Sequence, residues 1–342
     1  MKKIFLTSLP ALILLAACSS DNEPVNPNSS DDHRIDFYAT APKSSRAAST
    51  TTASLQSFVV YAFTNSAVIM NGVTVSRDGG SWTYSPAVYW PADPVDFYAL
   101  SPDIRQKSTA SPDNYNIIRG IEYGSTDQLY AVSLDRIESP APVPLTFRHA
   151  MSRVSIMLSS TSNRYAIEVY HVSLNNIALS GDFSLPEKNT DETDALGTWS
   201  NLSAPGAALV YYDLEGGTTL LSPTPRDLTE GNLNVSFFVP QPLTPLAYSS
   251  AEGFTGSYME IDCVVKDKLT GTKIWPNEHT PSYLLVQHSE SGKMLFPLST
   301  KSVTSWQQGY SYIYNVEINT TYSIDTIEFA PSVTNYIVSQ PF

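Results

Sequence analysis

The chain has 342 residues, 42% of them hydrophobic, which is enough for packed cores. This length favours two folded domains of roughly 150 residues each over a single small one. The formal net charge of −13 argues against nucleic acid or anionic lipid as a partner, because both would be repelled.

The beginning of the chain resembles a bacterial lipoprotein signal peptide. Lys2 and Lys3 precede an apolar stretch, Ile4–Leu15, that is too short to span a bilayer as a helix. It runs into Leu15-Ala16-Ala17-Cys18, where small residues precede a cysteine, as processing by the lipoprotein signal peptidase requires. We therefore expect Cys18 to carry lipid and to anchor the mature protein in a membrane. A plain secretory signal with an incidental cysteine is the alternative.

A polar segment, residues 19–33, follows the signal. It contains almost no apolar side chain and cannot fold alone, so we expect a flexible tether. Asp21 and Glu23 lie close behind Cys18 and resemble the acidic export signal of some Gram-negative lipoproteins. This predicts an outer membrane lipoprotein exposed at the cell surface. A generic polar tether is the alternative.

Apolar and polar residues then alternate with a period of two, which indicates β-strands. The clearest runs are 95–99, 154–158, 165–169, 235–239 and 310–318. A further run, Phe58–Phe63, is apolar on both faces. One apolar and one polar face is typical of strands in a two-sheet sandwich. Because no long amphipathic helix is found, the sequence predicts an all-β protein.

Turn and proline residues suggest how the strands are divided. Turns are expected at Asn71-Gly72, Asp78-Gly79-Gly80, Gly216-Gly217 and Thr270-Gly271. A proline cluster at Pro140, Pro142 and Pro144 marks the expected domain boundary. After a signal peptide at 1–18 and the tether, we therefore expect an N-terminal β-sandwich domain at 34–143 and a C-terminal one at 144–342.

Groups that could carry catalysis are sparse. The sequence has no nucleophile elbow, no zinc-binding His or Cys motif and no phosphate-binding glycine loop. His149 is expected to be a structural histidine bonded to a neighbouring loop, with a base or ligand as the alternative. Asp31-Asp32 and Asp191-Glu192 are expected in solvated loops, with weak calcium binding as the alternative. The sequence thus predicts no enzyme, cofactor or metal.

Three further segments carry candidate sites. Cys263 falls in the apolar register of Met259–Val265 and is expected to be a buried free thiol, because Cys18 is consumed by lipid. Val88-Tyr89-Trp90-Pro91 is expected to be a core strand ending at proline, with a stacking platform for sugars as the alternative. Asp325-Thr326-Ile327 matches a short O-glycosylation acceptor pattern, which makes Thr326 a candidate for modification.

The order and spacing of seven segments carry a family resemblance. They are Val60-Tyr61-Ala62-Phe63, Tyr89-Trp90-Pro91, 95–102, 127–131, 144–154, Val239-Pro240-Gln241-Pro242 and 306–312. The most telling is 144–154, which reads PLTFRHAMSRV. Together they resemble the fimbrillin family of lipoprotein-derived (type V) pilins. The resemblance runs from about Ile35 to the C-terminus and implies two tandem transthyretin-like (Greek-key) β-sandwich domains.

The resemblance also implies an assembly mechanism, in which a trypsin-like protease removes the first strand with its lipid and a strand of another subunit fills the groove. Ile35–Ala39 is the expected first strand. Arg46 is the expected cleavage site and Ala47 the new N-terminus, with Arg34 as the alternative site. An uncleaved anchor subunit, with Arg46 in a solvated loop, is a further alternative. Residues 324–342 are either a detachable donor strand or the last strand of the chain's own sheet.

The resemblance implies a structural or accessory subunit of a cell-surface fimbria that acts in adhesion. Its partners would be other fimbrial subunits, joined by β-strand complementation, and a host or bacterial surface receptor. The alternative is a surface glycan-binding lipoprotein of a polysaccharide-uptake system. An exposed planar row among the tryptophans would favour this alternative, and buried tryptophans would favour the pilin. These residues are Trp82, Trp90, Trp199, Trp275 and Trp306.

Overall fold

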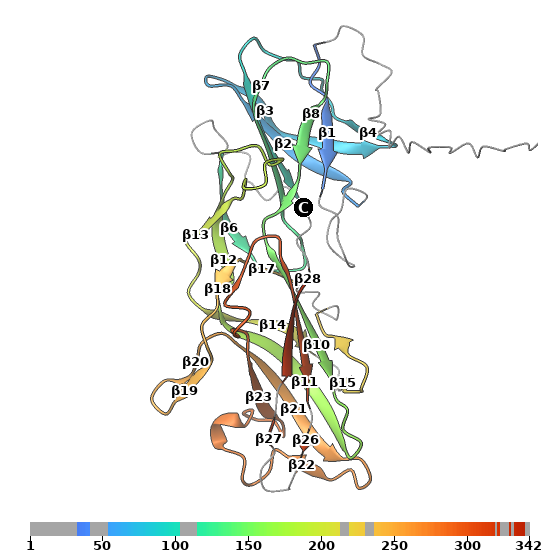
Figure 1. Ribbon diagram of the computed structural model, residues 1–342, viewed down its shortest axis with the longest axis vertical. Helices are drawn as coiled ribbons and strands as arrows, with labels where there is room; N and C mark the ends of the chain where they lie inside the picture. The colour runs from blue at the N-terminus through green and yellow to red at the C-terminus, as the bar shows by residue number, and fades with distance from the viewer. Residues whose placement is uncertain are drawn as a thin grey trace, which may run out of the picture. The chain divides into compact units, whose positions relative to one another are not determined.

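The computed structural model describes residues 33–41, 54–102, 115–212, 219–229, 236–318, 320–321, 328–329 and 332–338; for Thr219 and the last three ranges it describes the backbone alone. Residues 33–342 group as one compact unit. The described part consists of strands and loops with one 3-10 turn, η2 (Ser282–Leu284), and no α-helix (Figure 1). The predicted all-β class is therefore confirmed, whereas the division into two tandem domains stays a prediction.

The first large sheet has six strands, and its central strands are buried on both faces. Its order is β4 (Ser81–Thr83), β3 (Val68–Asp78), β2 (Ser57–Phe63), β5 (Val95–Ser101), β7 (Leu129–Arg136) and β9 (Arg148–His149). Phe58 and Val60 of β2 lie in one buried cluster, and Val59 and Tyr61 lie in another. Burial on both sides explains why the run Phe58–Phe63 lacks a polar face.

Two smaller sheets supply the partners of these two faces. The parallel pair of β1 (Phe37–Thr40) and β8 (Val143–Thr146) contributes to the cluster that contains Phe58. A second sheet has the order β13 (Thr198–Ser200), β12 (Ser180–Ser184) and β6 (Ile117–Glu122). Ile118 of β6 and Phe183 of β12 lie in the cluster that contains Tyr61. This cluster therefore joins segments from both sides of the boundary expected near residue 143.

The largest buried cluster combines two further sheets. The first comprises β14 (Gly206–Tyr212), β11 (Tyr165–Ile177), β21 (Tyr258–Asp267) and β22 (Lys273–Trp275), with β15 (Thr219–Leu220) on β11 and β23 (Gly292–Pro297) on β21. The second comprises β16 (Arg226–Asp227), β10 (Ser152–Ser159), β25 (Ser311–Glu317) and β28 (Ser332–Val338), with β17 (Phe237–Phe238) on β10. Three short pairs complete the fold: β18 (Gln241–Pro242) with β24 (Ser305–Trp306), β19 (Ala247–Ser249) with β20 (Gly253–Thr255), and β26 (Thr320–Thr321) with β27 (Glu328–Phe329).

Two buried side chains, those of Cys263 and Gln241, lie in this half of the chain. Cys263 is fully buried in the largest cluster, and this burial raises the pKa of its thiol. The predicted buried free thiol is thus confirmed. The Gln241 amide accepts a hydrogen bond from the Ala178 N–H at 2.6 Å and donates one to the Ala178 carbonyl at 3.0 Å. The Gln241 side chain thereby satisfies both backbone hydrogen-bonding groups of Ala178, a buried residue between β11 and β12.

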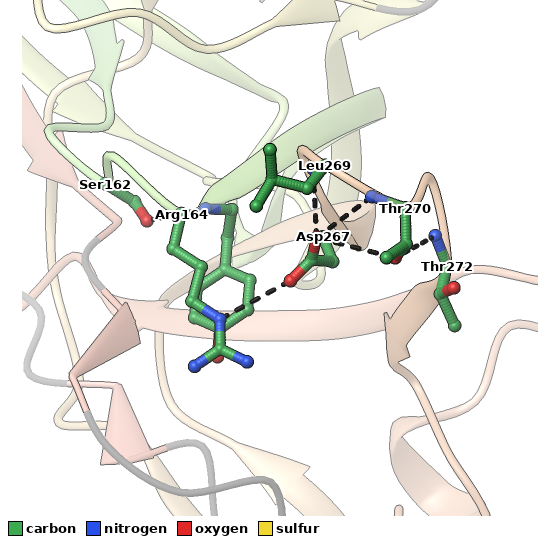
Figure 2. Close-up of polar contacts among 7 residues, drawn as sticks. Ser162, Arg164, Asp267, Leu269, Thr270 and Thr272 are labelled. Carbon is green, nitrogen blue, oxygen red and sulfur yellow. Dashed lines mark hydrogen bonds and ion pairs between the residues drawn. The ribbon is translucent and has the colours of Figure 1, made fainter.

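Two of the predicted turns are confirmed. Asp78-Gly79-Gly80 joins β3 to β4, and the turn at Thr270-Gly271 joins β21 to β22. Figure 2 shows how Asp267 holds the second turn, because its carboxylate accepts hydrogen bonds from the backbone of Leu269 and Thr270. These bonds lower the pKa of the Asp267 carboxyl, and Arg164 contacts its other oxygen at 3.4 Å.

The turn expected at Asn71-Gly72 is wrong. Both residues lie within β3, where the register against β2 shifts between Val60 and Tyr61. Gly72 is the extra residue of this β-bulge and has a φ of 69°, which glycine adopts without strain. Gly216-Gly217 lies outside the described residues.

Two glycines with positive φ allow a matched test of the fold. At Gly256, with a φ of +84°, an added Cβ would lie 2.0 Å from the Pro245 carbonyl oxygen; at Gly271, with a φ of +69°, it would meet nothing within 4 Å. Gly271→Ala should therefore cost only left-handed strain, about 1 kcal/mol. Gly256→Ala adds a backbone clash and should cost more than about 4 kcal/mol. Urea unfolding of both variants measures the difference, and equal losses would contradict this account.

Candidate functional site: the groove around the first strand

Strand β1, at the start of the described chain, is paired with a strand more than a hundred residues away. β1 and β8 run parallel, with Phe37 opposite Val143 (Figure 1). The Val143 N–H donates to the Asp36 carbonyl at 2.8 Å, and the Phe147 N–H donates to the Thr40 carbonyl at 2.7 Å. This parallel ladder fixes the register of β1. The predicted strand-like run Ile35–Ala39 is thus part of an ordered pair.

Alternate side chains of this segment are buried. Ile35, Phe37, Ala39 and Ala41 are at most 8% exposed, whereas Tyr38 is 46% exposed. The Phe37 ring lies among three others in the same cluster, with centroid distances of 5.7 to 6.2 Å. They belong to Phe58, Tyr84 and Phe97. The period-two pattern of the sequence therefore corresponds to one face of β1 filling the core.

A second backbone segment flanks the beginning of β1. The Ile35 N–H donates to the Val88 carbonyl at 3.0 Å, and Arg34 forms an antiparallel bridge with Tyr89. The Tyr84 hydroxyl donates to the Ile35 carbonyl at 2.5 Å, and burial raises the pKa of this hydroxyl. The peptide bond after Arg34 therefore lies within hydrogen-bonded backbone.

The Arg34 side chain is engaged as well. Its guanidinium donates to the Tyr84 carbonyl at 3.2 Å and lies 4.8 Å from the centroid of the Tyr84 ring. Of the predicted site residues, Cys18, Arg46, Ala47 and Thr326 lie outside the described residues. Arg34 is thus the one candidate cleavage residue that the structure places, and it lies at the beginning of the β1 segment. We call the surroundings of this segment the β1 groove: β8, the backbone of Val88-Tyr89 and the rings that pack on Phe37.

The sequence alone does not reveal the strand that pairs with β1. This partner comes from Val143–Phe147, which includes the last proline of the cluster and spans the domain boundary expected between residues 143 and 144. Val143, Leu145 and Phe147 are all buried in the cluster that contains Phe37. Their alternation was visible in the sequence, but alternation alone does not reveal a partner so distant along the chain.

His149 lies at the edge of the six-stranded sheet. Its Nδ1 is 2.7 Å from Oδ2 of Asp127, and both side chains are buried. The expected structural histidine bonded to a neighbouring loop is thus confirmed. Asp191 and Glu192 are exposed, and the described residues hold no group of three or more His, Cys, Asp or Glu placed to bind a metal ion.

The tryptophans form no exposed row. Trp82, Trp90 and Trp199 are half-buried, and Trp275 and Trp306 are buried. In the segment Val88–Pro91, Trp90 packs edge-on against Phe97 at 5.7 Å while Tyr89 is exposed. The core strand expected here is wrong, because the segment forms an isolated bridge at Tyr89 instead of a strand and none of its residues is buried. The burial of the tryptophans favours the pilin interpretation over the glycan-binding one. No helix in the described ranges is both long and apolar enough to cross a membrane.

The described part of 324–342 pairs within the chain. β28 runs antiparallel to β25, with Val333 opposite Val316, and β27 pairs with β26. In this structure the segment is therefore a strand of its own sheet.

Comparison with known proteins identifies the family. The fimbrillin-like family profile matches residues 31–335. The chain belongs to the fimbrillin-like family. The resemblance noted in the sequence is thus confirmed over most of the chain. Membership places the protein among fimbrial proteins of the cell surface and favours a structural, non-catalytic role.

Solved structures similar to this fimbrillin-like chain have low sequence identity to it. A fimbrial protein from Bacteroides vulgatus is 13% identical, with 89% of this chain and 99% of that chain covered and a TM-score of 0.44. A fimbrilin from Porphyromonas gingivalis is 11% identical, with 84% and 90% covered and a TM-score of 0.44. A comparison with curated proteins finds no match.

The alternation in β1 predicts unequal effects of two neighbouring substitutions. Phe37→Ala removes a buried ring and should lower the free energy of unfolding by about 3 to 5 kcal/mol. Tyr38→Ala, on the exposed face, should change it by less than about 0.5 kcal/mol. Urea unfolding of the full chain measures both. Equal losses would show that β1 does not fill the core as described.

Proposed function

We propose that this fimbrillin-like chain is a structural or accessory subunit of a cell-surface fimbria, and that copies join by exchanging β1 for a strand of a neighbour. The observation that carries this proposal is that β1 fills the core through alternate side chains yet belongs to a two-stranded sheet at the beginning of the fold. Adhesion through the assembled fibre is the biological role.

The proposed trigger is proteolysis after Arg46 by a trypsin-like protease, which leaves Ala47 as the new N-terminus. Arg46 lies five residues after Ala41, the last buried residue of the β1 segment. Cleavage at Arg34 is disfavoured, because Ile35 is fully buried and its N–H is bonded to the Val88 carbonyl. A cut after Arg46 releases the whole of β1 together with the lipid on Cys18.

Loss of β1 makes the subunit incomplete. The N–H groups of Val143 and Phe147 lose their acceptors, and the rings of Phe58 and Phe97 lose Phe37. An unpaired edge beside an apolar channel is a template for an incoming strand. A strand from another copy restores both the ladder and the packing, so the polymer becomes the stable state.

The C-terminal segment of another copy, released from its own pairing with β25 and β26, is the proposed donor. Ile327-Glu328-Phe329 repeats the apolar, acidic, aromatic order of Ile35-Asp36-Phe37. At the same spacing, Pro331 stands at the place of Ala39. An exchanged segment in this register offers Ile and Phe to the positions that Ile35 and Phe37 occupy.

A proline is compatible with this register. The carbonyls of Asp36 and Thr40 accept hydrogen bonds from β8, so these alternate residues present their backbone groups to β8. The N–H of Ala39 points to the other side of the strand. Pro331 at that place would therefore leave the ladder to β8 intact, although proline has no N–H to donate.

Before cleavage, the proposed location is the outer membrane, where the lipid on Cys18 would anchor the chain with its folded part at the cell surface. After cleavage, the proposed location is the fimbrium. The proposed partners are other fimbrial subunits, the processing protease and a host or bacterial surface receptor. The groove requires no cofactor, because backbone pairing and apolar packing supply the whole interaction.

The cleavage site gives the first test of this proposal. Arg46→Ala should leave a full-length, lipid-anchored monomer in the native host, because β1 cannot be released. Arg119→Ala, at an arginine whose side chain is 73% exposed in β6, is the control and should assemble normally. Electron microscopy of the cell surface and N-terminal sequencing measure the result. Unimpaired fibres from the Arg46 variant would contradict the mechanism.

The register gives the second test. A synthetic peptide spanning Ile327–Val338 should occupy the groove of protein trimmed after Arg46 and block its polymerisation. The same peptide with Phe329→Asp should block at least tenfold less well, because a carboxylate would be placed in the apolar site of Phe37. Light scattering of the trimmed protein follows polymerisation. Equal inhibition by both peptides would exclude this register.

A further inference from the structure

An exposed aromatic surface lies away from the groove. Tyr248 of β19 and Phe254 of β20 are direct cross-strand partners, and Tyr283 of η2 joins them. The Tyr248 and Tyr283 rings stack with centroids 4.6 Å apart and planes at 29°, and Phe254 lies 4.8 Å from Tyr248 and 5.8 Å from Tyr283. We call these three side chains the aromatic platform. Two segments separated in sequence build it.

The hairpin under the platform is fixed at its base. Gly256 has a φ of +84° and leaves no room for a Cβ against Pro245. The Asn176 side chain donates to the Gly256 carbonyl at 2.9 Å, and the Ser257 hydroxyl accepts from the Thr244 N–H at 3.1 Å. These contacts attach the hairpin to β11 and to the preceding loop. The rings are therefore held in place before any ligand arrives.

The loop that carries Tyr283 is also fixed. It follows Trp275, which is buried in the largest cluster. Asn277 and Thr280 bond each other, with the Asn277 N–H donating to the Thr280 hydroxyl at 2.9 Å and the Thr280 N–H donating to the Asn277 carbonyl at 3.0 Å. The Leu284 N–H then donates to the Pro281 carbonyl at 2.9 Å. A preorganised site loses little conformational entropy on binding.

The platform combines apolar faces with polar neighbours. Tyr248 is 46% exposed and Tyr283 is 47% exposed. Within the described residues, no side chain or backbone group hydrogen-bonds the hydroxyl of either tyrosine. Ser249 and Glu252, at the tip of the same hairpin, are exposed as well, and the Ser249 hydroxyl accepts from the Glu252 N–H at 3.0 Å. Flat apolar surface beside hydroxyl and carboxylate groups suits the alternating C–H and O–H faces of a sugar ring.

We propose that the aromatic platform binds a neutral carbohydrate by stacking of one or two sugar rings. Its size disfavours a protein partner, because two half-exposed tyrosines and the less exposed Phe254 offer at most about 300 Å², whereas a stable protein interface needs about 800 Å² per partner. The chain's charge of −13 decides against acidic sugars, which would be repelled. The site shares no residue with the β1 groove and does not depend on strand exchange.

Affinity electrophoresis of the full chain tests whether the platform binds a neutral carbohydrate. The probes are starch, xylan, galactomannan and neutral mucin O-glycans, with polygalacturonate as the acidic control. At least one neutral probe should retard the wild-type protein, and polygalacturonate should not. Tyr248→Ala and Tyr283→Ala should each weaken the retardation at least tenfold. Tyr283→Phe should retain at least half of it, because stacking needs the ring rather than the hydroxyl.

Leu269→Ala is the control, because Leu269 is 96% exposed and lies outside both the platform and the β1 segment; its binding should equal that of the wild type. No retardation by any neutral probe would overturn the assignment, as would equal retardation of wild type and both alanine variants. Dimerisation that requires Tyr248 and Tyr283 without any glycan binding would also overturn it, in favour of a second copy as the occupant. Fibre assembly of the same variants after cleavage is measured separately, so failure of either proposal is recognised on its own.

Discussion

The fit of Phe37 among three aromatic rings, together with the parallel ladder from β1 to β8, is the interaction on which the proposed biology of this fimbrillin-like chain depends. β1 is held by tertiary contacts with segments far away in sequence. Such a strand can be stable while it is covalently attached, because attachment keeps its local concentration high. Once the attachment is cut, an equivalent strand of another molecule competes on equal terms. Under the proposed mechanism, covalent connection, more than contact energy, would decide between monomer and polymer.

The stretch 144–154, the most telling in the family resemblance, gains a physical explanation from the structure. Phe147 packs against Phe58 in the β1 groove with ring centroids 5.2 Å apart. Arg148 donates to the Thr190 carbonyl at 2.8 Å, and the Thr190 N–H in turn donates to the Val132 carbonyl at 3.0 Å. Val154, a few residues on, lies in the largest cluster. One short segment therefore contributes to the β1 groove, holds the loop that lies beside β7, and contributes to the largest buried cluster.

What the sequence could predict was set by how local each signal is. Strands and the burial of Cys263 follow from period-two alternation, which is a property of neighbouring residues. The turn predicted at Asn71-Gly72 was wrong because a glycine with positive φ occurs in β-bulges as well as in turns. The sequence does not reveal the aromatic platform, because Tyr248 and Tyr283 are distant along the chain and meet only through tertiary folding. The pairing of β1 with β8 was invisible for the same reason.

The separation of the groove and the aromatic platform has a consequence for adhesion. The groove uses Val143, Phe147 and the rings around Phe37, whereas the platform uses side chains of β19, β20 and η2. The proposed stacking of sugar on these three rings would be a weak individual contact. A fibre repeats that contact in every subunit, and linked sites gain avidity of about 10²- to 10⁴-fold without any new interaction. Strand exchange would therefore convert a weak monomeric sugar contact into firm attachment, which explains why a polymer suits a binding site of this kind.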